Sequence, residues 1–148
     1  VCSSDLLAGA VMRGASSTTG SAASGDLLEA VKCYSDVLAR SPANAEALTY
    51  RGWLLVRTGN ERLQQQAAGD LDAAVAADPR YPDARAFRAI VFYRLGAFDE
   101  AAADLAVLDT LGAPPIITSL LDQFGVRQGI AAATATSRPT APATTATR

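Results

Sequence analysis

The sequence predicts an all-α protein, built as a short solenoid of antiparallel helix pairs. Hydrophobic residues make up 49% of the 148-residue chain, and many are alanines, as is typical of closely packed helices. Apolar residues recur at helical spacing, and glycine or proline interrupts each run. The segment "EALTYRGWLLVRTGN" (46–60) also aligns with "DARAFRAIVFYRLGAF" (83–98). Such internal repetition indicates a helical repeat array.

The repeat has two spacings. Residues upstream of the first glycine break recur 37 positions later: Pro42 with Pro79, Gly52 with Ala89, and Gly59 with Gly96. Residues further on recur 34 positions later: Ala67 with Ala101, Asp70 with Asp104, and Leu71 with Leu105. The middle unit therefore holds three extra residues between Gly59 and Ala67. We expect them in a connecting loop, because a loop tolerates an insertion better than a packed helix does.

The helix boundaries follow from the breaks between apolar runs. Pro42 and Pro79 end the helices before them, while Gly59 and Gly96 suit a left-handed helix cap. A final helix begins at Pro115, since proline is favoured at a first helical position. The expected helices are 26–40, 45–58, 62–77, 82–95, 98–111 and 115–132. Gly125 and Gly129 weaken the second half of the last one.

The motif pattern resembles the tetratricopeptide repeat family. Its alanine–aromatic–proline half appears as Ala30…Tyr34…Pro42 and Ala67…Leu71…Pro79, and as Ala101…Leu105 with Pro114 one residue late. Its other half appears as Leu48…Arg51-Gly52…Leu55 and Arg85…Arg88-Ala89…Phe92, with arginine replacing the family's central leucine. The resemblance covers residues 26–114. It implies about two full repeats, an N-terminal half-repeat and a C-terminal capping helix.

The resemblance also implies where the helices meet. Gly52 and Ala89 would lie at the closest approach between paired helices. Arg51 and Arg88 are expected to bury their stems there and to pair with acids of the second helix, such as Asp70 or Asp104.

In this family, one face of each first helix lines a concave groove that binds a peptide or protein segment. The matching residues are Glu46, Thr49, Trp53, Val56 and Arg57 in one unit, and Asp83, Ala86, Ile90, Tyr93 and Arg94 in the next. Trp53 and Tyr93 could instead be packing residues, and Arg57 and Arg94 solvated surface charges. The recurrence of both arginines at one repeat position favours the groove. The subtype that clamps a C-terminal carboxylate is disfavoured, since Thr49, Trp53, Ala86 and Ile90 occupy its key positions.

Composition excludes several function classes. With 13 basic and 15 acidic residues the net charge is −2, which argues against a nucleic-acid partner. The chain has no histidine, and Cys2 and Cys33 lack metal-ligand spacing. We therefore predict no catalytic residue, no metal site and no cofactor. Cys2 and Cys33 could pair in an oxidising compartment, or Cys33 could be a buried apolar residue and Cys2 irrelevant.

The resemblance favours a protein-interaction function with two alternatives. It is greatest to the repeat domain of bacterial cytochrome c-type biogenesis factors, which would make the domain membrane-anchored and extracytoplasmic, and the partner an apocytochrome c or the haem-ligation machinery. The alternative is a soluble, cytoplasmic scaffold with another protein partner. Residues 1–25 are interpreted as the end of a membrane anchor, or a non-native N-terminus, followed by a Ser/Gly linker. Residues 26–133 form the helical domain, and 134–148 a disordered Ala/Thr/Pro-rich tail.

Overall fold

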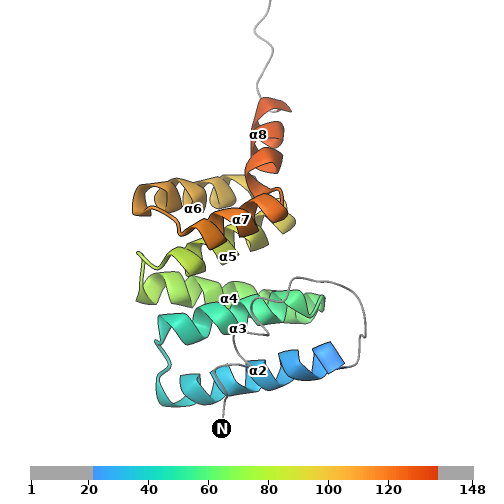
Figure 1. The fold of residues 1–148 in the computed structure, drawn as a ribbon, viewed down its shortest axis with the longest axis vertical. Helices are drawn as coiled ribbons and strands as arrows, with labels where there is room; N and C mark the ends of the chain where they lie inside the picture. The colour runs from blue at the N-terminus through green and yellow to red at the C-terminus, as the bar shows by residue number, and fades with distance from the viewer. Residues whose placement is uncertain (1–21, 137–148) are drawn as a thin grey trace, which may run out of the picture.

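The structure, a computed structural model, describes residues 22–136, and every regular element within that range is an α-helix. The helices are α2 (Ala22–Arg40), α3 (Ala45–Arg57), α4 (Glu61–Ala77), α5 (Pro82–Arg94), α6 (Phe98–Leu111), α7 (Pro115–Gln123) and α8 (Val126–Thr136). They stack as antiparallel neighbours, with α3 pairing with α4 and α5 with α6 (Figure 1). The predicted all-α array of helix pairs is confirmed.

Both ends of the helical region differ from the predicted bounds. Helix α2 begins at Ala22, inside the predicted linker, because two alanines, the best helix formers, precede Ser24 and Gly25 there. The predicted helix 115–132 is two helices, separated at Gly125, whose φ of 63° lies in the left-handed region. The second of them continues to Thr136, three residues into the predicted tail. The remaining residues of both predicted ends, including Cys2, lie outside the described range.

The three inserted residues do not lengthen a loop, contrary to the prediction. The connections Thr58–Asn60 and Leu95–Ala97 have equal length, whereas α4 has 17 residues and α6 has 14. The insertion is therefore the first turn of α4, Glu61–Leu63. A turn added at the free end of a helix leaves the packing register after it unchanged. The side chain of Asn60 accepts a hydrogen bond from the Arg62 amide at 3.0 Å and caps this turn.

Glycine serves the two purposes that the sequence predicts. Gly59 and Gly96 follow α3 and α5 with φ of 71° and 77°, so both sit in the left-handed conformation expected after a helix. Gly52 lies where α3 meets α4: a Cβ atom there would be 3.0 Å from Leu71 Cγ and 3.1 Å from the Ala67 carbonyl oxygen. The two helices can approach this closely because residue 52 has no side chain.

We expect Gly52→Val to destabilise the protein by about 1–3 kcal/mol, the usual cost of overpacking a core. The new side chain would press on Leu71 and on the α4 backbone. Gly69→Val is the matched control, because a Cβ at 69 meets no atom within 4 Å. Urea denaturation of both variants measures the difference. Equal stabilities would mean that the α3–α4 contact is looser than described.

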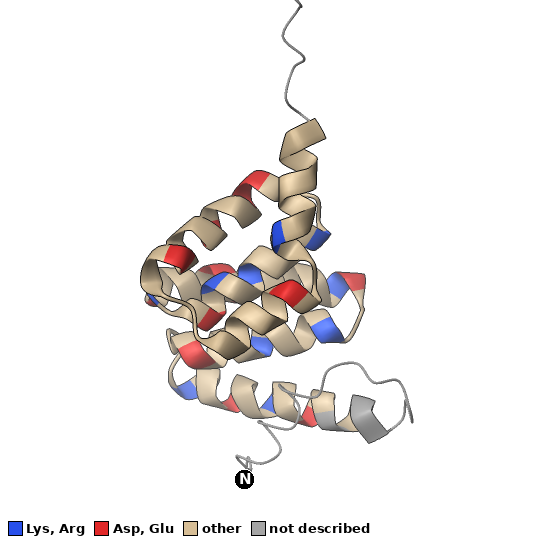
Figure 2. Ribbon diagram, turned by 45° about the horizontal axis from the view of Figure 1, so that its top comes forward, with Lys and Arg blue, Asp and Glu red and all other residues tan. Residues whose placement is uncertain are grey.

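The last two helices depart from the repeat pattern. Helix α3 packs on α2, and α5 packs on α4, so each first helix contacts the helix before it. Helix α7 makes no such contact with α6 and lies on α5 instead. Helix α8 then contacts α5, α6 and α7, and its ribbon is almost free of charged residues (Figure 2). The C-terminal segment therefore does not continue the array.

Candidate functional site

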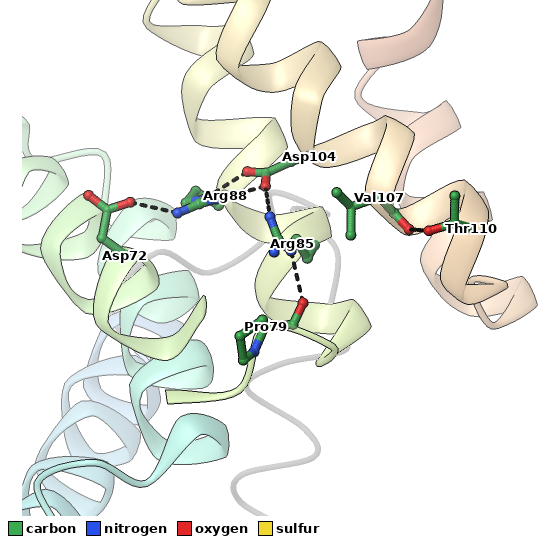
Figure 3. Close-up of polar contacts among 7 residues, drawn as sticks. All are labelled: Asp72, Pro79, Arg85, Arg88, Asp104, Val107 and Thr110. Carbon is green, nitrogen blue, oxygen red and sulfur yellow. Dashed lines mark hydrogen bonds and ion pairs between the residues drawn. The ribbon is translucent and has the colours of Figure 1, made fainter. Parts of the chain in front are cut away.

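A network of arginines and aspartates holds the helix pairs together (Figure 3). Asp104 on α6 is 1% exposed and accepts hydrogen bonds from Arg88 Nε and Nη2, both at 2.7 Å, and from Arg85 Nη1 at 2.8 Å. The equivalent pair, Arg51 and Asp70, is also bidentate at 2.7 Å. The hydrogen bonds to Asp104 raise the pKa of Arg88. The predicted pairing of Arg51 and Arg88 with second-helix acids is confirmed.

Arg88 also reaches the neighbouring helix pair. Its Nη1 atom donates to Asp72 on α4 at 3.0 Å, so one guanidinium joins α4, α5 and α6. These arginines are committed to internal partners. Arg57 and Arg94 are the arginines that the sequence assigns to the groove.

The eight predicted groove residues lie at positions that share one side of each helix: Thr49, Trp53, Val56 and Arg57 on α3, and Ala86, Ile90, Tyr93 and Arg94 on α5. We call this surface the α3–α5 face. Five of its residues are buried, with exposed fractions of 0–3%: Thr49, Trp53, Val56, Ala86 and Ile90. Arg57 and Tyr93 are partly buried, and Arg94 is exposed. Burial lowers the pKa of Arg57. The face is thus largely covered within the chain.

Aromatic rings account for the burial of Trp53. The indole stacks on Phe87 of α5, with ring centroids 4.5 Å apart and an interplanar angle of 16°. The edge-to-face contact with Phe124, which caps α7, has a centroid distance of 5.6 Å. Trp53 is therefore a packing residue in this conformation, as one of the two alternatives states. Phe124 is itself 37% exposed, so a single ring lies between this side of the indole and solvent.

Tyr93 is held in a similar way at the other end of the face. Its ring lies 5.8 Å from that of Phe98. It also lies directly against Gly129 of α8, where an added Cβ would overlap the ring atoms Cε2 and Cζ and the hydroxyl oxygen. The two aromatic residues predicted to line a groove are both covered by the C-terminal segment.

A tyrosine cluster, which the repeat pattern did not predict, joins α3 to α5. The Tyr50 hydroxyl donates to Asp83 Oδ2 at 2.6 Å, and the Tyr50 ring stacks with Tyr34 of α2 at 6.0 Å. Burial, and then the charge of Asp83, raises the pKa of Tyr81 to about 12. Asp83 is thus engaged internally, whereas Glu46 is exposed. The one sequence signal for the Tyr50–Asp83 hydrogen bond is their separation of 33 residues, which is close to the length of one repeat.

Cys33 lies buried on α2 and is disulfide-bonded, which agrees with the oxidised alternative for this residue. Cys2, the chain's other cysteine, lies outside the described residues.

Antiparallel helix pairs, a glycine at the close α3–α4 contact and equivalent salt bridges in successive units are typical of a helical repeat protein. The tetratricopeptide repeat model matches residues 22–61 and 65–113, more than half of the chain, which therefore belongs to that family. The unmatched residues 62–64 overlap the inserted turn of α4, residues 61–63. Tetratricopeptide repeat domains are protein–protein interaction modules and typically non-catalytic scaffolds. Among curated proteins, no match was found.

Two further properties concern the described residues alone. Between 22 and 136, no cluster of cysteine and acidic side chains has a geometry that could hold a metal ion. None of the helices there is both long and apolar enough to cross a membrane.

Proposed function

We propose that the α3–α5 face binds a segment of a partner protein. The observation that carries this proposal is the repetition of one set of positions: Arg57 corresponds to Arg94, Val56 to Tyr93 and Trp53 to Ile90. Equivalent positions on neighbouring helices produce one continuous surface, since α3 and α5 are in contact. An apolar centre with an arginine from each unit at its edge suits a segment with apolar anchors and some acidic residues.

The partner class stays a proposal with two forms. The resemblance to cytochrome c-type biogenesis factors supports an apocytochrome held for haem ligation by a membrane-tethered domain. The alternative is a scaffold for another protein. These two partner classes can be separated by whether the full gene encodes further residues before Val1. A stretch of about 20 apolar residues ending at Met12 would form a membrane anchor and favour the first class.

The test begins with peptides selected from a random display library against the full chain. Trp53→Ala is expected to weaken such peptides by about 2 kcal/mol or more, the usual cost of losing a buried aromatic anchor. Arg57→Ala should cost only about 0–1 kcal/mol and reduce the dependence of affinity on salt, because the arginine lies at the edge. Titrations at two salt concentrations measure both effects.

Two controls accompany this test. Because Trp53 packs on Phe87, circular dichroism must show that Trp53→Ala remains folded. Asp36→Ala on the exposed side of α2 replaces an acid away from the face. An acid of α4 such as Asp72 would be an unsuitable control, since Asp72 pairs with Arg88. Selected peptides that bind a folded Trp53→Ala/Arg94→Ala variant as well as the wild type would place the binding surface elsewhere.

A further inference from the structure

The C-terminal segment, α7–α8, covers Trp53 and Tyr93 of the α3–α5 face, the surface proposed to bind a partner. In a continuing array α7 would pack on α6, as α5 packs on α4, but it contacts α5 and not α6. Helix α7 therefore lies over α5, while α8 rises past α6 at the end of the array and contacts α5, α6 and α7 (Figure 1). The helix pairs end at α6, and the remaining segment packs on them in a different way.

The segment presents apolar residues to that surface at helical spacing. Ile117 and Leu121 of α7, and Val126 and Ile130 of α8, are buried in one cluster with residues of the α3–α5 face, namely Trp53, Val56, Ala86 and Ile90. Each pair is four residues apart and so lies on one side of its helix. An amphipathic helix laid on an apolar surface is a common mode of segment recognition.

Two contacts make the fit specific to residue type. Phe124 meets the edge of Trp53, and Gly129 leaves the space that the Tyr93 ring fills. Gly125, in the left-handed conformation, provides the bend that places these two contacts on different helices. A single partner helix cannot reproduce both contacts. It would need apolar residues four apart, and either an aromatic ring for Trp53 or a very small residue against Tyr93.

The polar attachment of the segment is weak by comparison. Within residues 22–136, one salt bridge joins it to the helix pairs, Arg127 to Asp109 at 2.6 Å, with the side chains 34% and 56% exposed. Exposed pairs of this kind contribute about 0–1 kcal/mol. Helix α7 has only nine residues, and Ile116 on it is exposed. Apolar burial against α5, α6 and Trp53 of α3 therefore contributes more to holding the segment than its polar contacts do.

We propose that α7–α8 is an autoinhibitory segment, an intrachain occupant of the α3–α5 face that a partner helix of similar pattern displaces. The proposal rests on the proposed function, because it regulates access to that same surface. Displacement exposes Trp53 and Tyr93 to the partner, and the segment stays attached through residues 112–114. Binding is then a competition between two helices for one surface, and free protein is mostly closed.

The test uses Gly129→Leu in the full chain, with Gly69→Leu as matched control. A side chain at 129 collides with the Tyr93 ring, whereas one at 69 enters open space on α4. The probe is a labelled peptide with the sequence of residues 113–136. Gly129→Leu is expected to bind this peptide at least about tenfold more tightly than wild type, a difference of about 1.4 kcal/mol. Gly69→Leu should bind it as the wild type does.

Fluorescence provides the second measurement, because Trp53 is the chain's only tryptophan. Acrylamide should quench it more strongly in Gly129→Leu than in wild type or Gly69→Leu. The added peptide should reverse that increase. If Gly129→Leu does not fold, Phe124→Ala takes its place, since it removes the ring over Trp53 without adding volume. The same changes are then expected with a smaller amplitude.

Unchanged peptide affinity and unchanged quenching in a folded variant would overturn the autoinhibitory role. That result is distinct from failure of the proposed function. If library peptides bind the wild type and depend on Trp53, the face is a binding surface even where α7–α8 is a fixed part of the fold. The opposite outcome is that Gly129→Leu binds the 113–136 peptide more tightly, while the affinity of no library peptide falls on Trp53→Ala. In that case α7–α8 covers the α3–α5 face, but the face does not bind a partner.

Discussion

Asp104→Ala is expected to lower the free energy of unfolding by about 3 kcal/mol, within the range for removing one partner of a buried ion pair. Asp104 is the shared acceptor of Arg85 and Arg88 and is 1% exposed. Its loss removes the buried acceptor shared by the two arginines, whose side chains are only 15% and 17% exposed. Urea denaturation followed by circular dichroism measures the change.

Asp109→Ala is the matched control, since it also removes an aspartate of α6 that accepts from an arginine. The Asp109–Arg127 pair is exposed, so the expected cost is about 0–1 kcal/mol. Near-equal effects of the two substitutions would show that Asp104 contributes no more than a surface charge.

Ending the chain after Ala113 is expected to destabilise the repeat pairs sharply, because it uncovers the α3–α5 face. Uncovering Trp53, which Phe124 helps to bury, and the apolar residues clustered with the segment costs up to about 1.5–3 kcal/mol for each side chain that becomes fully exposed. The melting temperature measures the loss. A partner that binds the exposed face should restore part of the stability, since a ligand of the folded state stabilises it.

The control deletes Arg138–Arg148, the part of the Ala/Thr/Pro-rich tail that its composition predicts to bury no apolar surface. The melting temperature of this shortened chain should stay within about a degree of that of the full chain. A loss of about 1 kcal/mol in stability would lower the melting temperature by several degrees in a domain of this size. If both deletions were silent, α7–α8 would have no role in stability.

The repeat pattern predicted helices α3 to α6 closely, because small residues, prolines and glycines mark their ends and contacts. Gly52, Gly59 and Gly96 have the roles that their spacing indicated. The pairing of Arg51 with Asp70 was also predictable, since both residues recur at matched positions in the next unit. Local signals and repetition were sufficient for these elements.

The C-terminal segment was not predictable in the same way. The sequence indicated one helix that caps the end of the array, but the left-handed Gly125 divides it. The side on which α7 packs depends on competition between α5 and α6 for Ile117 and Leu121, and no repeat partner exists to reveal the outcome. Trp53 illustrates the consequence: the repeat assigns it to the α3–α5 face, while its burial depends in part on Phe124, 71 positions away along the chain.

The bridging position of Arg88 bears on how the array unfolds. In a linear repeat protein, each unit is stabilised by its own contacts and by those with its neighbours, and weak coupling between units allows them to melt separately. Arg88 ties Asp72 of one pair to Asp104 of the next, and the Tyr50–Asp83 hydrogen bond crosses the same boundary. These cross-links penalise a state in which one pair is folded and the other is not. Such a penalty favours unfolding of the two pairs as one cooperative unit.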